Sequence, residues 1–140
     1  MTVLLDTNII LDALQERSPF DIEAKEIVLR AENGEMTCLF TANAAADIFF
    51  LYSKARDMKS ARAALDFLLK NYGVISVTHE DCNNAMSLFI EDFEDALVVV
   101  CAQKVKADYI VTRDEELLLE ESPIKLIKPK KMISLLNSKI

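Results

Sequence analysis

Short apolar runs alternate with helix-length segments along this chain of 140 residues, and the alternation restricts the folds that it can adopt. The β-favouring runs cover residues 2–5, 36–40, 74–77 and 109–111, with a short edge strand expected at 125–127. Helical spacing of apolar side chains marks residues 21–31, 42–55, 58–71, 93–106 and a terminal segment around 132–136. Strands that alternate with helices of this length form parallel sheets with helices on both faces. The sequence therefore predicts an α/β fold, a three-layer α/β/α sandwich around a small central parallel sheet.

Capping residues indicate where two further helices begin. Asp6 directly follows the first strand and can cap a helix that begins at Asn8. Thr78 and Asp81 have the spacing of a capping box, with Asp in place of the usual Glu or Gln, and predict a helix that runs to Phe89. Sheets of this kind bind ligands beyond the carboxyl ends of their strands, where the strand order reverses, so Asp6 stands where a site is expected.

The composition indicates a single domain over residues 1–140. Hydrophobic residues make up 51% of the chain and only 2 glycines are present, which excludes a disordered tail and a loop-rich disulfide scaffold. The 3 cysteines are widely spaced without a CxxC pair, so we expect reduced thiols in the core. The first apolar segment lacks a basic flank and is interrupted by Asp6 and Asp12. We therefore expect neither a signal peptide nor a membrane span, and a cytoplasmic protein.

Four aspartates stand in or beside segments that should be buried. They are Asp6 after the first strand, Asp47 within the helix at 42–55, Asp95 at the start of the helix at 93–106, and Asp114 after the strand at 109–111. No lysine or arginine lies one helical turn from Asp47 or Asp95 to neutralise the carboxylate. Two carboxylates about 4 Å apart repel by roughly 4 kcal/mol at a dielectric constant of about 20, and a divalent cation removes that conflict. An all-oxygen ligand set favours Mg²⁺ or Mn²⁺ and suits metal-assisted hydrolysis of a phosphodiester.

Each of these aspartates also has a structural interpretation. Asp6 can serve only as a helix cap, and Asp114 can be an ordinary turn residue. Asp95, like Asp92 one turn earlier, can occupy the favourable N-terminal end of a helix. Asp47 is the hardest to explain in this way, because Asp is unfavourable within a helix and its neighbours are apolar. The four positions together are therefore more informative than any one of them.

The segments LLDTNIILD, IFFLY after a mid-helix acid, DFEDAL and ADYIVTRD occur in this order along the chain. In this order they resemble the PIN-domain family of metal-dependent ribonucleases, which includes the VapC-type toxins of bacterial toxin–antitoxin modules. The resemblance covers essentially the whole chain, and the family fold is a small parallel sheet flanked by helices. It implies four metal-binding acids and two polar residues that accompany them: Asp6, Asp47, Asp95 and Asp114, with Asn8 and Thr112. Asp92 is then an auxiliary carboxylate or an exposed acid at a helix start.

The resemblance implies an endoribonuclease that uses Mg²⁺ or Mn²⁺ to cleave RNA phosphodiester bonds and leaves a 5′-phosphate. It also implies a homodimer and, for a toxin, a cognate antitoxin. The family commonly has Glu at the second acidic position, whereas Asp47 is one methylene shorter and reaches less far. An alternative is therefore a catalytically weak PIN-fold module that binds RNA or has a regulatory role. A phosphotransfer phosphatase is disfavoured, because its Asp-x-Asp motif requires Asp where Asn8 stands.

The net charge of −7 argues against a simple basic clamp for nucleic acid. Divalent ions at the acidic site would cancel part of this charge, and the remaining acidity favours a basic protein partner. The basic clusters at residues 54–62 and 125–131 can grip phosphates, and an ordinary solvated face explains each equally well. The aromatic residues Phe49, Phe50 and Tyr52 are interpreted as core or as a surface for a second copy, rather than as base-stacking platforms.

Overall fold

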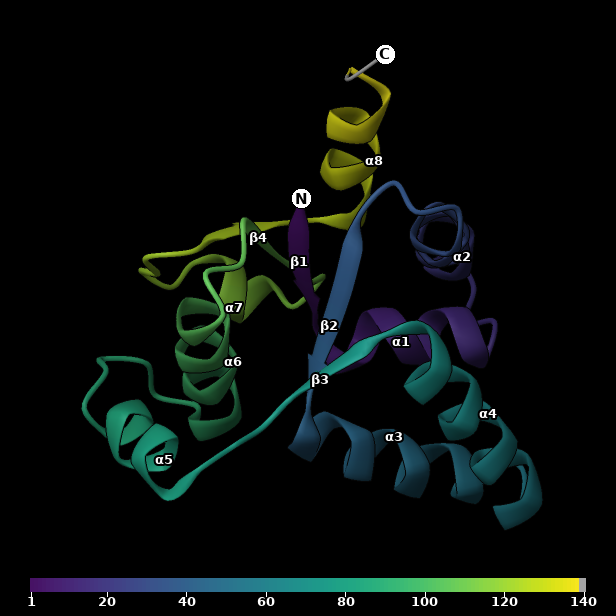
Figure 1. Cartoon of the computed structure of the whole chain (residues 1–140), viewed down its shortest axis with the longest axis horizontal. Coiled ribbons are helices and arrows are strands. Elements are labelled where there is room, and N and C mark those ends of the chain that lie inside the picture. The colour runs from purple at the N-terminus through teal and green to yellow at the C-terminus, as the bar shows by residue number, and fades with distance from the viewer. Residues whose placement is uncertain (139–140) are drawn as a thin grey trace.

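Five strands and eight helices make up residues 1–138, which the computed structural model describes (Figure 1). The strands are β1 (Thr2–Leu5), β2 (Thr37–Thr41), β3 (Gly73–Ile75), β4 (Tyr109–Val111) and β5 (Lys125–Ile127). The helices are α1 (Thr7–Leu14), α2 (Asp21–Glu32), α3 (Ala42–Ala55), α4 (Met58–Asn71), α5 (His79–Met86), α6 (Phe93–Lys104), α7 (Glu115–Leu118) and α8 (Pro129–Asn137). The last two positions of the predicted domain, Lys139 and Ile140, lie outside the described residues.

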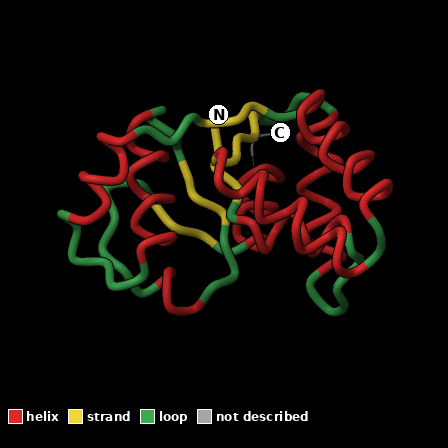
Figure 2. The backbone as a smooth tube through the Cα atoms, turned by 90° about the horizontal axis from the view of Figure 1, so that it is seen from below, coloured by secondary structure: helices red, strands yellow, loops and turns green. Residues whose placement is uncertain are grey.

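The strands form one parallel sheet in the order β3-β2-β1-β4-β5. The chain builds outward from β1 to β2 and β3, then returns to the other side of β1 with β4 and β5. Figure 1 shows α5 and α6 on one side of the sheet and α1, α2 and α4 on the other, and Figure 2 shows the strands between two groups of helices. The predicted α/β fold is confirmed. The strand order reverses between β1 and β4, which is where such sheets bind ligands.

Alternation along the central strand divides the interior into two cores. Val3 and Leu5 are buried with residues of α1, α2, α3 and α8, whereas Leu4 is buried with the apolar face of α6. Helix α6 is buried from Ala96 to Ala102 because it lies against the middle of the sheet. A strand covered on both faces is apolar at successive positions, which explains why β1 shows no polar alternation. None of the helices within residues 1–138 is long and apolar enough to cross a membrane.

Three local expectations differ from the structure. Helix α5 ends at Met86, and Phe89 is fully exposed in the segment that leads to α6, so the prediction of a helix to Phe89 was wrong. The four-residue helix α7 was not predicted, because one turn is too short to show a periodic pattern. Cys38 and Cys101 are buried free thiols as expected, but Cys82 is only partly buried. These differences leave the sheet and its carboxyl edge unchanged.

A buried ion pair connects α1 to the end of β4. The Asp12 side chain is fully buried, and Arg113 donates to its two oxygens, from Nε at 2.6 Å and from Nη2 at 3.1 Å. Arg17 lies farther away, with Nη1 3.8 Å from Oδ1, and the Arg113 guanidinium lies 4.0 Å from the centre of the Phe20 ring. The sequence suggested Asp12 only as an interruption of an apolar run. Its actual partner is 101 residues away, and the pair fixes the segment that follows β4.

We expect Arg113→Ala to lower the free energy of unfolding by about 2–3 kcal/mol, because it leaves a buried carboxylate with only the longer ion pair to Arg17. The measurement is urea denaturation followed by circular dichroism. The matched control is Lys70→Ala, which breaks the exposed pair of Lys70 and Asp66 at 2.8 Å and should change stability little. Equal losses in the two variants would contradict a structural role for the buried pair.

Candidate active site

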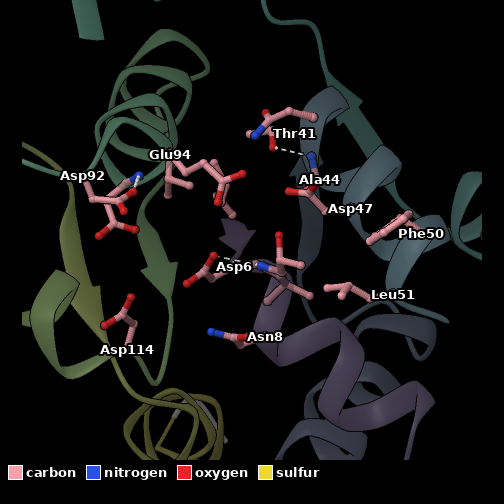
Figure 3. A pocket seen from close by; sticks show the side chains of 16 residues that line it. Asp6, Asn8, Thr41, Ala44, Asp47, Phe50, Leu51, Asp92, Glu94 and Asp114 are labelled. Atoms are coloured by element: carbon pink, nitrogen blue, oxygen red, sulfur yellow. Dashed lines mark hydrogen bonds between the residues drawn. The ribbon is translucent and has the colours of Figure 1, made fainter. Parts of the chain in front are cut away.

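A cavity of about 390 Å³ opens at the carboxyl ends of β1 and β2, and acidic side chains from four segments line it (Figure 3). The acidic residues in its wall are Asp6, Asp47, Asp92, Glu94, Asp95 and Asp114. All four aspartates suggested by the sequence are therefore brought together, along with Asn8 and Asp92. Thr112 is fully buried behind the wall and contacts Asp6. The cavity lies at the reversal of strand order, as expected for an open parallel sheet.

Asp6 has both carboxylate oxygens fixed by hydrogen bonds. Oδ1 accepts from the backbone N–H of Thr7 at 2.8 Å, and Oδ2 accepts from the hydroxyl of Thr112 at 2.7 Å. Burial raises the pKa of Asp6 above its ordinary value, the two hydrogen bonds oppose that rise, and the charge of Asp114 adds to it. The predicted helix cap is confirmed, because Asp6 is the N-cap of α1. Its structural role therefore coexists with its position in the cavity wall.

Asp114 is joined to Asp6 through one threonine. The backbone N–H of Asp114 donates to the Thr112 hydroxyl oxygen at 3.0 Å, and that hydroxyl donates to Asp6. Oδ1 of Asp114 accepts from the N–H of Glu116 at 3.0 Å, which makes Asp114 the N-cap of α7. Oδ2 of Asp114 has no hydrogen-bond partner among residues 1–138. One oxygen thus holds the side chain in place while the other remains available to a ligand.

The N-terminus of α6 carries a second pair of acids. Asp92 is the N-cap of α6, and its Oδ1 accepts from the backbone N–H of Asp95 at 3.0 Å. The expectation of an acid at a helix start is therefore confirmed for Asp92. Burial, followed by the negative charges of Asp92, Asp114, Asp6 and Glu94, raises the pKa of Asp95 from 3.8 to about 7. Carboxylates from three different segments thus raise the pKa of Asp95, which shows that they lie close enough to repel its charge.

Asp47 lines the opposite wall of the cavity, on α3, and lies near Glu94, which in the sequence was only one of several acids in the segment DFEDAL. Burial, followed by its interaction with Asp47 and the negative charges of Asp92 and Asp6, raises the pKa of Glu94. The available signal was the density of acids in DFEDAL, but local sequence cannot show which acid of a first helical turn faces a distant helix. The structure adds Glu94 to the candidate site.

Asn43 is a further residue of the cavity wall that the sequence did not single out. It lies one helical turn before Asp47 on α3, and its Oδ1 is buried without a hydrogen-bond partner in the described part of the chain. Buried oxygens are normally satisfied, so an unpaired one in a polar cavity points to a ligand or water. The i, i+4 spacing of Asn43 and Asp47 was the signal that could have identified it.

The donor groups around the cavity fit a hard divalent cation. All of the acidic donors are carboxylate oxygens, and Asn8 and Asn43 add amide oxygens, which are the ligands that Mg²⁺ and Mn²⁺ prefer. Within residues 1–138, no three acidic, histidine or cysteine side chains already form a group able to hold a metal ion. In their present rotamers three of the carboxylates cap helices. Binding of a cation therefore requires some of these side chains to turn toward one another, and the charge of the cation offsets the repulsion between their carboxylates.

The two basic clusters suggested by the sequence lie in different places. Lys54 is on α3, close to the cavity, with its ammonium 5.0 Å from the centre of the Phe50 ring. Lys125 instead pairs in register with Tyr109 at the amino ends of β4 and β5, at the opposite edge of the sheet. Lys128 pairs with the exposed Glu115 at 2.8 Å. Lys54 of the first cluster therefore lies beside the acidic cavity, whereas the second cluster is divided between the two ends of β5, with Lys128 at the carboxyl end.

The chain is therefore an α/β protein with a parallel sheet and a cluster of acidic residues where the strand order reverses, which is a candidate site for metal-dependent catalysis. The PIN domain family model matches residues 2–116, and the chain belongs to that family. The predicted family is thereby confirmed. No curated protein matches the sequence significantly.

Solved structures with the same fold come from several bacteria. VapC20 of Mycobacterium tuberculosis, described as a toxin that cleaves the sarcin–ricin loop, is 15% identical with a TM-score of 0.69, over 82% of this chain and 92% of that one. VapBC2 of Rickettsia felis, solved with a DNA fragment from its promoter, is 20% identical with a TM-score of 0.65, over 91% and 98%. A toxin–antitoxin complex from Klebsiella pneumoniae is 19% identical with a TM-score of 0.67, over 91% and 97%. At these identities the likeness establishes the fold.

We expect Asp95→Asn to stabilise the metal-free protein at pH 8. The pKa of Asp95 is raised to about 7, so its carboxyl group contributes stability that is complete below pH 3.8 and lost as the pH rises through about 7. Replacing it by a neutral amide removes the repulsion, for a gain of about 1 kcal/mol after solvent screening and roughly 3–5 °C in Tm. Thermal unfolding with a chelator present measures this.

The control for this experiment is Glu91→Gln, which neutralises an exposed acid outside the cavity wall and should leave Tm nearly unchanged. At pH 4, Asp95→Asn should lose its advantage over the parent protein. A gain that is equal at pH 4 and pH 8, or a loss at pH 8, would contradict the electrostatic account of the cavity.

Proposed function

We propose that this chain is an endoribonuclease that requires Mg²⁺ or Mn²⁺, with Asp6, Asp47, Asp95 and Asp114 as the metal-binding acids. The observation that carries the proposal is the cavity at the switch point, whose wall combines carboxylates from β1, α3, α6 and the end of β4. Helix capping accounts for the positions of Asp6 and Asp114, but it does not explain why Asp47 and Asp95 line the same cavity. A divalent cation offsets their repulsion and at the same time serves hydrolysis of a phosphodiester.

The residues of the cavity divide into rigid and adjustable donors. Asp6 is rigid, because Thr7 and Thr112 fix its two oxygens, whereas Asp114 and Asp92 each have one oxygen held by a helix N-terminus. When bound, Mg²⁺ or Mn²⁺ supplies Lewis acidity that activates water and stabilises negative charge on a phosphate. Asn8 and Thr112 orient the donors around Asp6, and Asp92 serves as an auxiliary carboxylate.

Glu94 offers an explanation for the short side chain at the second acidic position. The family commonly has Glu there, whereas this chain has Asp47. Glu94 faces the cavity from α6 and lies near Asp47. In this proposal the two residues act together, and Glu94 supplies the extra length that Asp47 lacks. Together the two residues would provide a carboxylate ligand for the metal on the α3 side of the cavity.

We further propose that the protein is the toxin of a toxin–antitoxin module and forms a homodimer. One of the compared structures is described as a toxin–antitoxin complex, another as VapBC2 bound to a DNA fragment from its promoter, and a third as a toxin that cleaves the sarcin–ricin loop. The net charge of −7 is complementary to a basic protein partner. This support comes from the family and from charge, so the role has its own test below.

The alternative of a PIN-fold module that binds metal or RNA without useful turnover also has a specific basis, namely Asp47 in place of Glu. Calorimetry separates it from the nuclease. Mn²⁺ binding that disappears in Asp95→Asn, combined with the absence of RNA cleavage under any condition, would favour the non-catalytic module. Cleavage that depends on the metal would exclude it.

We expect the purified protein to cleave single-stranded RNA in Mn²⁺ or Mg²⁺ and to leave a 5′-phosphate. Asp6→Asn and Asp95→Asn should each lower the rate by about 100-fold or more, because each removes a carboxylate that holds the metal. Asp66→Asn, at an exposed position on α4, is the control and should cleave at the parent rate. Labelled RNA fragments on a gel provide the measurement. Unchanged cleavage by Asp6→Asn or Asp95→Asn would show that the site is wrongly assigned.

For the toxin role, we expect controlled expression of the chain to arrest bacterial growth, and Asp6→Asn to abolish the arrest. Co-expression of a small basic protein encoded beside its gene should restore growth and form a complex that elutes with the chain in size-exclusion chromatography. Growth arrest by Asp6→Asn as strong as that of the parent would separate any toxicity from nuclease activity. Light scattering of the chain alone tests the homodimer.

A further inference from the structure

The α3 wall of the cavity continues beyond its acidic part as an apolar and then a basic stripe. Asn43, Asp47, Phe50, Leu51 and Lys54 follow one another at helical spacing, so they lie along one face of α3. Phe50 and Leu51 line the cavity although they are 56% and 40% exposed. Figure 3 shows Phe50 and Leu51 on the α3 side, beyond Asp47 as seen from the acidic residues of α6. In the described part of the chain, Phe50 is the only aromatic residue of this cavity wall.

From the sequence, Phe49, Phe50 and Tyr52 were interpreted as core or as a surface for a second copy, and the structure separates Phe50 from the other two. Phe49 and Tyr52 are partly buried, whereas Phe50 points to solvent at the rim of the cavity. The hydrophobic effect opposes exposure of an aromatic ring, and Phe50 gains no core contact in return. Its one recorded ring interaction is with the ammonium of Lys54, 5.0 Å from the ring centre. An exposed ring beside a cation is therefore the feature of α3 that the acidic site does not explain.

The base and the phosphate of a nucleotide match the aromatic and the basic residue of this stripe, in the order in which they follow Asp47. Along a helix that rises 1.5 Å per residue, Phe50 lies about 5 Å and Lys54 about 10 Å beyond Asp47. A base has an aromatic face that stacks on Phe50, and a phosphate has a negative charge that pairs with Lys54. The acidic part of the cavity repels phosphates unless a cation is present, so stacking supplies attraction that charge alone does not.

We propose that Phe50 stacks on an unpaired base of the bound RNA strand and that Lys54 contacts a phosphate of the same strand. The inference deepens the proposed nuclease function, because it rests on RNA as the substrate and assigns the residues that position it. Duplex bases are already stacked on each other, so Phe50 selects nucleotides in single-stranded segments or loops next to the cleaved bond. A stacking face accepts every base, so it selects unpaired structure and contributes little to sequence preference.

The chain contains no tryptophan, which allows a direct test of the contact. Phe50→Trp introduces a single indole at the rim of the cavity, and Ca²⁺ in place of Mg²⁺ provides a hard cation for binding experiments. We expect short single-stranded oligoadenylate to quench the fluorescence of this tryptophan. An abasic oligomer of the same length, which keeps the phosphates and lacks the bases, should leave the fluorescence unchanged. The control is Phe89→Trp, at a fully exposed position outside this cavity, which oligoadenylate should not quench.

Affinity measurements extend the test to the native ring. By fluorescence anisotropy of labelled RNA, Phe50→Ala should bind about 5- to 100-fold more weakly, and Phe50→Tyr should restore most of the affinity. Lys54→Gln should weaken the RNA and the abasic oligomer alike and should reduce the salt dependence of binding, because it removes a phosphate contact. Phe50→Ala should not affect the abasic oligomer.

Three results would overturn the proposal. The first is unchanged fluorescence of Phe50→Trp with RNA, whether or not anisotropy detects binding. The second is equal quenching by the abasic oligomer. The third is conversion of a dimer to a monomer by Phe50→Ala without loss of RNA affinity, which would assign the ring to a contact between copies of the chain. Base-dependent quenching without cleavage in Mg²⁺ or Mn²⁺ would support stacking on Phe50 and reject the nuclease function. RNA cleavage by Phe50→Ala with the affinity of the parent protein would support the nuclease function and reject the stacking role of Phe50.

Discussion

Strands β1 and β4 lie side by side and end at the same level of the sheet. The polar groups that follow them are partly buried, so they must form hydrogen bonds with one another. The backbone N–H of Asp6 donates to the carbonyl of Val111, and the buried hydroxyl of Thr112 links the Asp6 carboxylate to the backbone of Asp114. The next residue, Arg113, is held by the buried carboxylate of Asp12 on α1. The same few contacts therefore close the centre of the sheet and set the spacing of two acids in the cavity. Stability and site geometry depend on one another here.

Helix caps resolve the apparent choice between structural and functional interpretations of the acids. Asp6, Asp92 and Asp114 are N-caps of three helices, and each accepts a hydrogen bond from a backbone N–H that would otherwise lack a partner. The positive ends of the helix dipoles also favour carboxylates at these positions. Three like charges can therefore stand around one cavity in the absence of a cation. A bound cation would draw the free oxygens of these capping carboxylates toward one another, and in doing so would compete with the caps.

The sequence was sufficient for features that depend on local periodicity. All five strands were predicted to within two residues, because buried parallel strands are continuous apolar runs between helices. The gathering of acids at one edge followed from the order of strands and helices. Contacts between distant segments could not be predicted in this way. The partnership of Asp12 with Arg113, the approach of Glu94 to Asp47 and the exposure of Phe50 depend on how helices pack, and sequence spacing within one helix contains no information on its neighbours.

An acidic protein can act on a polyanion only if the attraction is concentrated where the reaction occurs. The net charge of −7 is distributed over the whole molecule, but the field that a phosphate meets is determined by the groups within about one Debye length, roughly 8–10 Å. At the cavity these groups include the carboxylates, any bound cation, Arg113 and Lys54. Stacking on Phe50 adds an attraction that salt does not screen. Under the proposed function, binding of RNA is therefore conditional on the cation at one end of the α3 stripe and on an unpaired base at the other, so the acidity that opposes non-specific binding also contributes to selectivity.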